Sequence, residues 1–324
     1  MDIVIVGSLA YDELETEVGK VSNSLGGSGT FAGLAAAFHA RRRLDGSGSL
    51  PLGLVCAIGE DFGQSDSDTL RQSGLNLDGI ETIEGGRTFR WHGRYEGDMG
   101  QAITIETQQN VLDGYEPKVP VSWWSPRVLF LANNHPSIQS HVLDQCEGAK
   151  FTAMDSMNLW ITTAFPELSN VLRRVDLAIL NENEVRMIAK DENLIRAGES
   201  IRDGSALTGG VDSGSGPSIL IIKKGEHGSI VLTDTGMLTL PAFPTAQIVD
   251  PTGCGDSFAG TILTFLSEST DIIPTLDELH NAVVHATVTA SFTIADFGIA
   301  GLVELDRGEY HARLDTYRRM VGLI

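Results

Sequence analysis

Short apolar runs, each ended by glycine or by a polar residue, recur along this chain and predict buried β-strands. They cover residues 2–7, 51–58, 128–132, 151–154, 177–180 and 219–223. Segments with the helical spacing of apolar residues separate most of these runs, which is the pattern of βαβ units. The sequence therefore predicts an α/β fold with a doubly wound, mainly parallel sheet. We find no internal repeat and expect a single domain over residues 1–324.

Helices are predicted where apolar residues recur every three or four positions and where strong helix formers accumulate. The predicted segments are residues 30–43, 61–73, 255–267 and 276–293. The first of them is rich in alanine and ends in Arg41-Arg42-Arg43. Cations are favoured near the carbonyl end of a helix, so these arginines are expected to close it.

Residues 87–107 have a different pattern, with charged and aromatic residues, a Gly/Asp break and then alternating apolar residues. This pattern predicts a β-hairpin that is exposed on at least one face. Phe89, Trp91 and Tyr95 lie at odd positions of one strand and should share a face. They could contact a ligand or a partner, or simply pack into the core, and the sequence leaves the three interpretations open.

Composition excludes several classes of protein. A formal net charge of −20 argues against a nucleic-acid partner, because phosphate backbones are bound by basic surfaces. No basic leader and no apolar run near the ~20 residues of a membrane span is found. The three cysteines, Cys56, Cys146 and Cys254, are widely spaced, which indicates a reduced cytoplasmic protein without disulfides. The acidic balance fits an ordinary cytosolic surface or a salt-adapted one.

The strongest chemical signal is Asp250-Pro251-Thr252-Gly253-Cys254-Gly255-Asp256-Ser257-Phe258, followed at once by an apolar helical pattern. A glycine-rich turn that leads into a helix directs free backbone N–H groups at one point, where an anion such as a phosphoryl group can bind. Asp256, in the first turn, could accept a proton from a hydroxyl. The alternative is an ordinary helix start, where aspartate is favoured in any case.

This segment resembles the carboxy-terminal signature D-T-x-G-A-G-D-x-F of the ribokinase-like (PfkB) carbohydrate kinases, with Pro251 and Cys254 as the departures. The resemblance implies that Asp256 is the catalytic base and that Gly253, Cys254 and Gly255 form the anion hole. In many members the aspartate at the first position of this signature and a threonine at its third position help to bind a monovalent cation. Those positions are Asp250 and Thr252 in this chain.

Two further segments resemble the family's nucleotide motifs, in the family's order. Asn181-Glu182-Asn183-Glu184 resembles N-x-x-E, which implies that Asn181 and Glu184 position Mg²⁺ through water. The alternative is a solvated helix start. Lys223-Lys224-Gly225-Glu226-His227-Gly228 resembles the nucleotide loop T-x-G-x-x-G, with Lys223 in place of threonine and with Gly225 and Gly228 retained. The alternative is a plain hairpin turn.

The amino-terminal part resembles the family's acceptor site. Asp12, after the first predicted strand, corresponds to the aspartate that binds substrate hydroxyls, and Gly26 and Gly27 begin the G-G-x-G/A signature. The asparagine that is common in ribokinases is Phe31 here, and Thr30 could replace its polar contact in part. Ribose is therefore in doubt as the acceptor.

Two other segments bear on the acceptor. Asn133 and Asn134 end a predicted strand and are further candidates for touching it. Asp155-Ser156-Met157-Asn158 resembles the family's D-x-N segment, but Trp160 and Ile161 stand where an arginine is expected.

The resemblance extends over essentially the whole chain and implies a kinase that uses ATP, Mg²⁺ and K⁺ to phosphorylate a sugar or a nucleoside. It also implies a β-sheet lid, built from about residues 12–21 and 87–107, which in the family often forms a homodimer interface. Ribose, fructose-like sugars, 2-keto-3-deoxy acids and nucleosides all remain open as acceptors. Phe31 and the aromatic lid favour something less polar than ribose, such as a nucleoside.

Two other functions fit parts of the sequence. A sugar or nucleoside sensor would keep the fold without turnover, and the presence of Asp256 in its full context argues against it. Residues 27–32 also satisfy the dinucleotide fingerprint G-x-G-x-x-A of dehydrogenases. That fingerprint needs a buried strand directly before it, whereas residues 20–24 are mostly polar. No Walker-type phosphate loop occurs.

Overall fold

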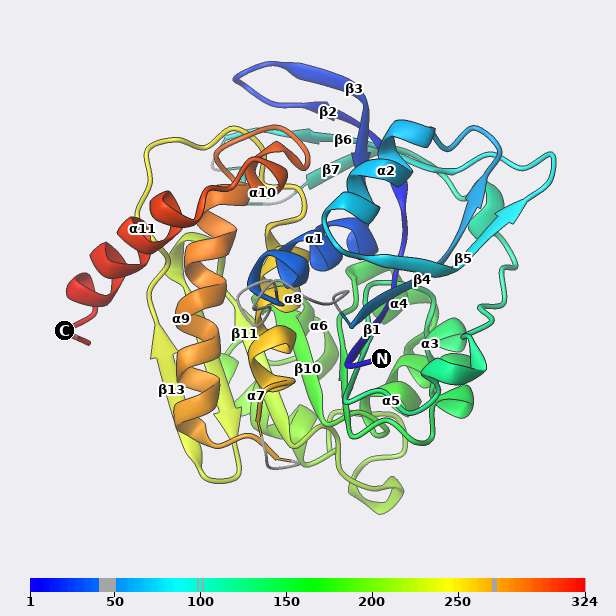
Figure 1. The fold of residues 1–324 in the computed structure, drawn as a ribbon. Coiled ribbons are helices and arrows are strands. Elements are labelled where there is room, and N and C mark those ends of the chain that lie inside the picture. Colours follow the sequence, from blue (N-terminus) through cyan, green and yellow to red (C-terminus); the bar gives the residue numbers. More distant parts are fainter. Residues whose placement is uncertain (41–50, 98, 101, 270–272, 324) are drawn as a thin grey trace.

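The computed structural model describes residues 1–40, 51–97, 99–100, 102–269 and 273–323. Its main element is a nine-stranded sheet with the order β13-β12-β11-β10-β9-β8-β1-β4-β5 (Figure 1). All neighbours in it pair in parallel except β12, which is antiparallel to both β11 and β13 at one edge. The strands are β1 (Ile3–Val6), β4 (Leu52–Gly59), β5 (Asn76–Ile83), β8 (Val128–Leu131), β9 (Phe151–Met154), β10 (Leu177–Asn181), β11 (Ile219–Lys223), β12 (Ser229–Thr233) and β13 (Gly236–Leu240).

Helices cover both faces of this sheet, which explains why its central strands are apolar on both sides. In β1, Ile3 and Ile5 belong to the core on one face, whereas Val4 and Val6 belong to the core on the other. The first face carries α1 (Ser28–Ala40), α2 (Gln64–Gln72), α8 (Cys254–Leu266), α9 (Leu276–Thr293), α10 (Ala300–Val303) and α11 (Arg307–Met320). The second carries α3 (Pro136–Gln145), α4 (Asn158–Thr163), α5 (Phe165–Leu172), α6 (Glu182–Ala189) and α7 (Leu194–Arg202).

A second, four-stranded sheet lies across one end of the main sheet, at the top of Figure 1. Its order is β3-β2-β6-β7, with β2 (Ala10–Glu15), β3 (Lys20–Gly26), β6 (Phe89–Tyr95) and β7 (Ala102–Gln108). The edge strand β7 is exposed along nearly its whole length. These strands come from the two segments for which the family resemblance implies a lid, and they extend beyond the expected bounds.

The predicted mainly parallel α/β fold is confirmed. The strands predicted at residues 151–154 and 219–223 have those bounds, and so does the helix predicted at residues 276–293. The first predicted helix forms α1, and its three closing arginines lie outside the described residues. The edge strand β5 was missed because its sequence, Asn-Leu-Asp-Gly-Ile-Glu-Thr-Ile, is too polar to stand out as a strand.

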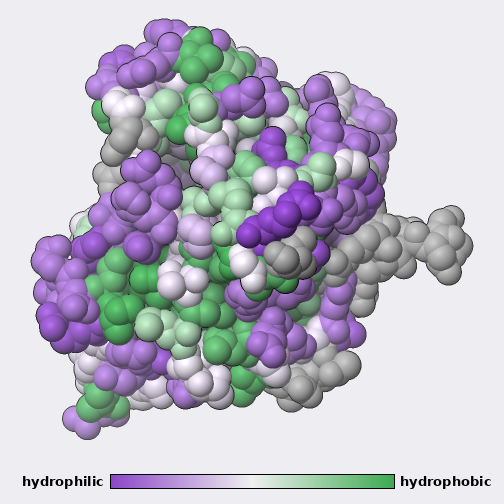
Figure 2. Space-filling view, turned by 90° about the vertical axis from the view of Figure 1, so that its left-hand side faces the viewer, coloured by the Kyte–Doolittle hydropathy of each residue, from purple (hydrophilic) through white to green (hydrophobic). Residues whose placement is uncertain are grey.

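The surface toward α11 and β13 is shown in Figure 2, where hydrophilic residues along the rim surround a paler, more apolar middle. No helix in the described part of the chain combines the length and apolar character that crossing a bilayer requires. Cys56 and Cys146 are buried, Cys254 is partly exposed, and all three are free.

Candidate active site

Four ionisable side chains lie either at the end of a strand of the main sheet or in the first turn of a helix. Asp155 follows β9, Glu184 is in the first turn of α6, Lys223 ends β11, and Asp256 is in the first turn of α8. The carboxyl ends of parallel strands meet at one edge of a sheet, which is where ligands bind in open α/β folds. Lys223 forms an ion pair with Asp155, and its pKa is raised by the charges of Asp155, Glu184 and Asp256, as expected for groups that lie close together.

The turn before α8 depends on Gly253, which is the N-cap residue and has a φ of 75°. Glycine adopts this left-handed conformation without strain. A Cβ atom at this position would also lie 2.2 Å from the ring of Phe31 in α1. Phe31 thus packs directly beneath the turn, and only glycine fits above it.

Asp250 ties this turn to the segment after α9. Its carboxylate accepts hydrogen bonds from the backbone N–H of Thr252 and of Gly298, each at 2.9 Å. Asp250 is fully buried, and burial raises the pKa of its carboxyl group. The side chain of Thr252 hydrogen-bonds the same carboxylate. A buried carboxylate whose described partners are all neutral is a suitable ligand for a cation.

The anion hole predicted at Gly253, Cys254 and Gly255 is not uniform. The N–H of Cys254 donates to the carbonyl of Pro251 at 3.2 Å, within the turn. The N–H of Gly255 meets no acceptor in the described part of the chain. Gly255 therefore offers the free donor, at the positive end of α8.

Asp256 has a pKa that burial, and after it the negative charge of Asp155, raises to about 7. Lys223 partly offsets this rise. A carboxyl group with a pKa near neutrality can both take up and release a proton at physiological pH, which suits a general base.

Lys223 forms an ion pair with Asp155, with 2.8 Å between Nζ and Oδ2. The other carboxylate oxygen of Asp155 accepts the N–H of Ser156 at 2.8 Å. Burial lowers the pKa of Lys223, but the charges of Asp155, Glu184 and Asp256 outweigh it and raise the pKa overall. The lysine is therefore charged.

Asn181 and Glu184 form a capping box at the start of α6, with Glu184 buried. The Asn181 backbone N–H donates to Glu184 Oε2 at 2.8 Å, and Asn181 Nδ2 donates to Oε1 at 2.5 Å. Burial, followed by the charge of Asp155, raises the pKa of Glu184 to about 8. No three His, Cys, Asp or Glu side chains among the described residues form a preassembled metal site.

The loop after β11 contains Gly225 and Gly228, with φ values of 54° and 82°. A Cβ atom at Gly228 would lie 1.9 Å from the carbonyl oxygen of Leu240. The two glycines thus shape a tight turn between the antiparallel strands β11 and β12. Lys223 points away from this turn, toward Asp155 and Gly255.

Asp12, in β2, is 4% exposed, and its carboxylate lies against Gly26. A Cβ atom at Gly26 would be 1.9 Å from Asp12 Oδ2, so any side chain there would displace the carboxylate. The N–H of Gly27 donates to the same group. Burial, and then the charges of Asp250 and Asp256, raise the pKa of Asp12 to about 8.

Three expected acceptor contacts are placed differently by the structure. Phe31 is 1% exposed and Thr30 is fully buried, so neither side chain offers surface to an acceptor in this conformation. Both lie on the first turns of α1, which packs into the core. The amide of Asn133 is already engaged, since its Oδ1 accepts from Trp160 Nε1 and its Nδ2 contacts the sulfur of Met157.

Comparison with known proteins agrees with this geometry. Residues 1–304 match the model of the pfkB family carbohydrate kinases. The chain belongs to this family. It is a kinase of the ribokinase type, a phosphotransferase that acts on hydroxyl groups of sugars or nucleosides.

Individual relatives are more distant. A cytidine kinase of Thermococcus kodakarensis is 26% identical over 269 residues, which cover 81% of this chain and 87% of the relative. A nucleoside kinase of Methanocaldococcus jannaschii has a similar structure, with a TM-score of 0.73 at 17% identity over 98% of this chain and 99% of that one. An E. coli protein assigned as ribokinase II, solved with ATP and Mg²⁺, has a TM-score of 0.74 at 16% identity, with 97% and 99% covered.

The dehydrogenase interpretation is not supported in this kinase. Residues 27–32 follow β3, a strand of the small sheet, and not the buried parallel strand that a dinucleotide fingerprint needs.

Two residues of the site have no specific role predicted from the sequence. Asp155 belongs to the D-x-N segment but was given no role, because its partner Lys223 is 68 positions away. Tyr95, in β6, accepts a hydrogen bond from the hydroxyl of Thr252 at 3.2 Å. It thereby joins the small sheet to the turn before α8, and the aromatic alternation of β6 was the only signal for it.

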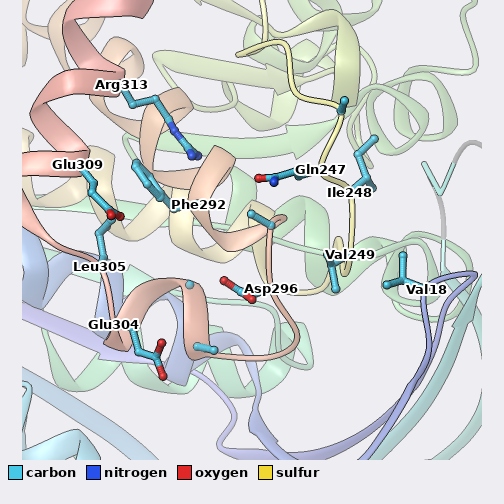
Figure 3. A pocket seen from close by; sticks show the side chains of 14 residues that line it. Val18, Gln247, Ile248, Val249, Phe292, Asp296, Glu304, Leu305, Glu309 and Arg313 are labelled. Carbon is cyan, nitrogen blue, oxygen red and sulfur yellow. The ribbon is translucent and has the colours of Figure 1, made fainter.

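A cavity of about 690 Å³ lies beside the segment that precedes Asp250 (Figure 3). Its wall includes Val249, next to Asp250, together with Phe292, Asp296 and Glu309. The guanidinium of Arg313 lies 3.5 Å from the ring centre of Phe292 and occupies one side. None of Asp155, Glu184, Lys223 and Asp256 lines this cavity, so the cavity is separate from that group of side chains.

Proposed function

We propose that this chain is an ATP-dependent kinase that phosphorylates a hydroxyl group of a nucleoside, with Asp256 as the base. The observation that carries the proposal is the position of Asp256. Its carboxyl group, with a pKa near 7, lies one residue after the free N–H of Gly255 and beside Lys223. A base, an anion donor and a cation thus meet where a γ-phosphoryl group would be transferred.

In the proposed reaction the Asp256 carboxylate accepts the proton of the acceptor hydroxyl. The acceptor oxygen forms its bond to the γ-phosphorus while the bond to the ADP oxygen breaks. The N–H of Gly255 donates to the phosphoryl oxygens, which gain negative charge during the transfer. Asp12 holds the acceptor by accepting from a neighbouring hydroxyl, and Gly26 leaves room for its carboxylate.

Mg²⁺ and the nucleotide have suitable residues at the ends of β10 and β11. The donor set of Asn181 and Glu184 consists of oxygen ligands, and their mutual hydrogen bonds leave contact through water as the expected mode. When bound, Mg²⁺ would neutralise phosphate charge. The turn with Gly225 and Gly228 would lie along the nucleotide.

A monovalent cation, K⁺ in our proposal, suits the turn at Asp250 and Thr252. The Thr252 hydroxyl contacts both Tyr95 and the Asp250 carboxylate. Its one proton goes to one of them, and an oxygen lone pair can face a cation. The buried charge of Asp250, with neutral described partners, would be compensated by the cation. A cation held by Asp250 and Thr252 would stabilise the geometry of the turn before α8.

The small sheet is proposed to act as a lid over the acceptor. Asp12 and Tyr95 both come from this sheet. Tyr95 contacts Thr252 in the turn before α8. Asp12 is close enough to Asp250 and Asp256 for their charges to raise its pKa. Closure would exclude water from the phosphoryl group. Homodimerisation through the same sheet stays a prediction of the family resemblance.

The nucleoside proposal is supported by the likeness to a cytidine kinase. The test incubates the chain with MgATP, K⁺ and one candidate at a time: cytidine, other nucleosides, ribose, fructose and a 2-keto-3-deoxy acid. ADP formation and the mass of the phosphorylated product are measured. A nucleoside is expected to react fastest, and a sugar that reacts faster would overturn the nucleoside proposal.

The sensor alternative is tested with the same candidates. A ligand at 100 times its dissociation constant should stabilise the fold by about 2.7 kcal/mol in a thermal-shift assay. Binding of an acceptor without any phosphorylated product would replace the kinase proposal by a sensor.

A further inference from the structure

The ion pair between Asp155 and Lys223 lies against the anion hole, and not in the outer part of the nucleotide loop. A Cβ atom at Gly255 would be 3.0 Å from Lys223 Nζ, so the ammonium group borders the space that a side chain at Gly255 would occupy. Gly255 also carries the free N–H at the start of α8. The charge of Lys223 and the helix terminus therefore face the same point.

In this pair each carboxylate oxygen of Asp155 accepts a hydrogen bond, whereas Lys223 has N–H donors without a described acceptor. Asp155 has both oxygens engaged, one by Ser156 and one by Lys223, and its side chain is 6% exposed. An ammonium group has three N–H donors. In the described part of the chain that of Lys223 donates to Asp155 alone, and its side chain is 19% exposed. Lys223 is thus oriented by Asp155 and keeps donors for a further acceptor.

The type of residue at position 223 matters for what it can reach. The family signature has threonine here, which is short and uncharged. The longer lysine side chain extends from the end of β11 to the first turn of α8. A fixed positive charge at that point stabilises the negative charge that a phosphoryl group spreads over its oxygens during transfer.

We propose that Lys223 is a catalytic residue that binds the γ-phosphoryl group during transfer, and that Asp155 is the positioning residue that directs its ammonium group to the anion hole. The inference rests on the proposed kinase function and deepens it. It assigns two residues to the transition state, and it separates Lys223 from the remainder of the nucleotide loop.

The first test is Lys223→Met, which keeps the length of the side chain and removes its charge. The kcat is expected to fall about 10²-fold, as when one preorganised donor is removed from a transition state. Lys223→Arg should recover part of the loss. A fall of less than about threefold, or no difference between the Met and Arg variants, would overturn the proposal.

Arg202→Met serves as the matched control for the loss of a partly buried cation. Arg202 lies in α7 and donates to the carbonyl of Ser218, just before the amino end of β11, whereas Lys223 is at the carboxyl end of that strand. This variant should lower Tm without changing kcat. If kcat falls as much in Arg202→Met as in Lys223→Met, the lysine is only structural.

Nucleotide binding gives a test that does not depend on the acceptor. With Lys223→Met, the Kd of a non-hydrolysable MgATP analogue should rise about tenfold, whereas the Kd of MgADP should change less than about twofold. Equal weakening of both ligands would contradict a γ-phosphoryl contact. This comparison remains valid if the wild-type chain phosphorylates no candidate acceptor, an outcome that rejects the proposed function on its own.

The pH profile separates Lys223 from Asp155. The groups that act on Asp256 are Asp155 from β9 and Lys223 from β11, with Asp12 and Cys254 as further neighbours. Lys223→Met removes an attraction, so the acid limb of kcat/KM should move to higher pH. Asp155→Asn removes a repulsion and should move it to lower pH. Shifts in the same direction, or none, would contradict the arrangement.

Discussion

Asp256 has acidic neighbours on both its proposed nucleotide side and its proposed acceptor side. Among the described residues that influence its pKa, Lys223 is the one cationic side chain, and it lies on the nucleotide side. On the nucleotide side, Asp155 and Glu184 share the charge of Lys223. On the proposed acceptor side, Asp12 and Asp250 have only neutral described partners, namely backbone N–H groups and, for Asp250, the side chain of Thr252. The nucleotide side is therefore partly neutralised by the chain itself, whereas the acceptor side depends on a proton or a bound cation.

This difference explains how Asp256 could serve as a base although the regions on both of its sides are negative. Burial raises the pKa of Asp256, the charge of Asp155 raises it further, and Lys223 limits the rise to about 7. Without Lys223 the pKa of Asp256 would be higher still. The following predictions test the contrast between the two sides, beginning with the largest expected effect.

Replacing Asp256, the proposed base, removes the group on which both sides act. Asp256→Asn keeps the shape of the side chain, so turnover should fall by roughly 10²–10⁴-fold while ATP affinity changes little. In the wild type, the acid limb of kcat/KM should have an apparent pKa near 7. Asp306→Asn, at the start of α11, is the matched control, because Asp306 caps a helix outside the site. Near-normal turnover in Asp256→Asn would show that another group is the base.

A cation added to the acceptor side should have the next largest effect. If Asp250 and Thr252 bind K⁺, turnover in K⁺ should exceed turnover in Na⁺ or Tris several-fold at matched ionic strength. The reason is that the cation neutralises the buried carboxylate and orders the turn that carries the anion hole. Equal rates in the three buffers would remove both residues from the cation site.

The cost of the uncompensated side should appear in the pH dependence of stability. The pKa of Asp12 is raised to about 8 in the folded chain, against about 4 when unfolded. Its contribution is complete below pH about 4 and is lost as the pH rises toward 8. Asp12→Asn should therefore raise Tm at pH 8, by roughly 2 °C or more, and have little effect at pH 4. The same change in Tm at both pH values would show that the pKa of Asp12 is not raised by folding.

The smallest effect is expected at Cys254, where a thiolate could have been stabilised by the helix terminus. Burial, and after it the charges of Asp250 and Asp256, instead raise the pKa of its thiol. The sulfur lies 3.8 Å from the carbonyl oxygen of Ala290. A small thiol reagent should therefore inactivate the wild type no faster than Cys254→Ala. Rapid inactivation that MgATP prevents and that Cys254→Ala resists would show the thiol to be reactive.

The central strands and the glycine turn were determined by the sequence alone. Strands buried on both faces must be apolar throughout, so β9 and β11 could be read from their composition. Gly253 was identifiable because a turn into a helix at that point needs a left-handed residue. The polar edge strand β5 was missed for the converse reason, since a strand with one open side carries no continuous apolar run.

The contacts that distinguish the two sides of Asp256 were decided only by the tertiary structure. Asp155 and Lys223 are 68 positions apart, and Tyr95 and Thr252 are 157 apart. Phe31, expected at the acceptor, lies instead beneath Gly253. Such pairs depend on which strands become neighbours and on how far one helix packs over another. Local periodicity shows where a strand ends, but it contains no information about which other strand ends beside it.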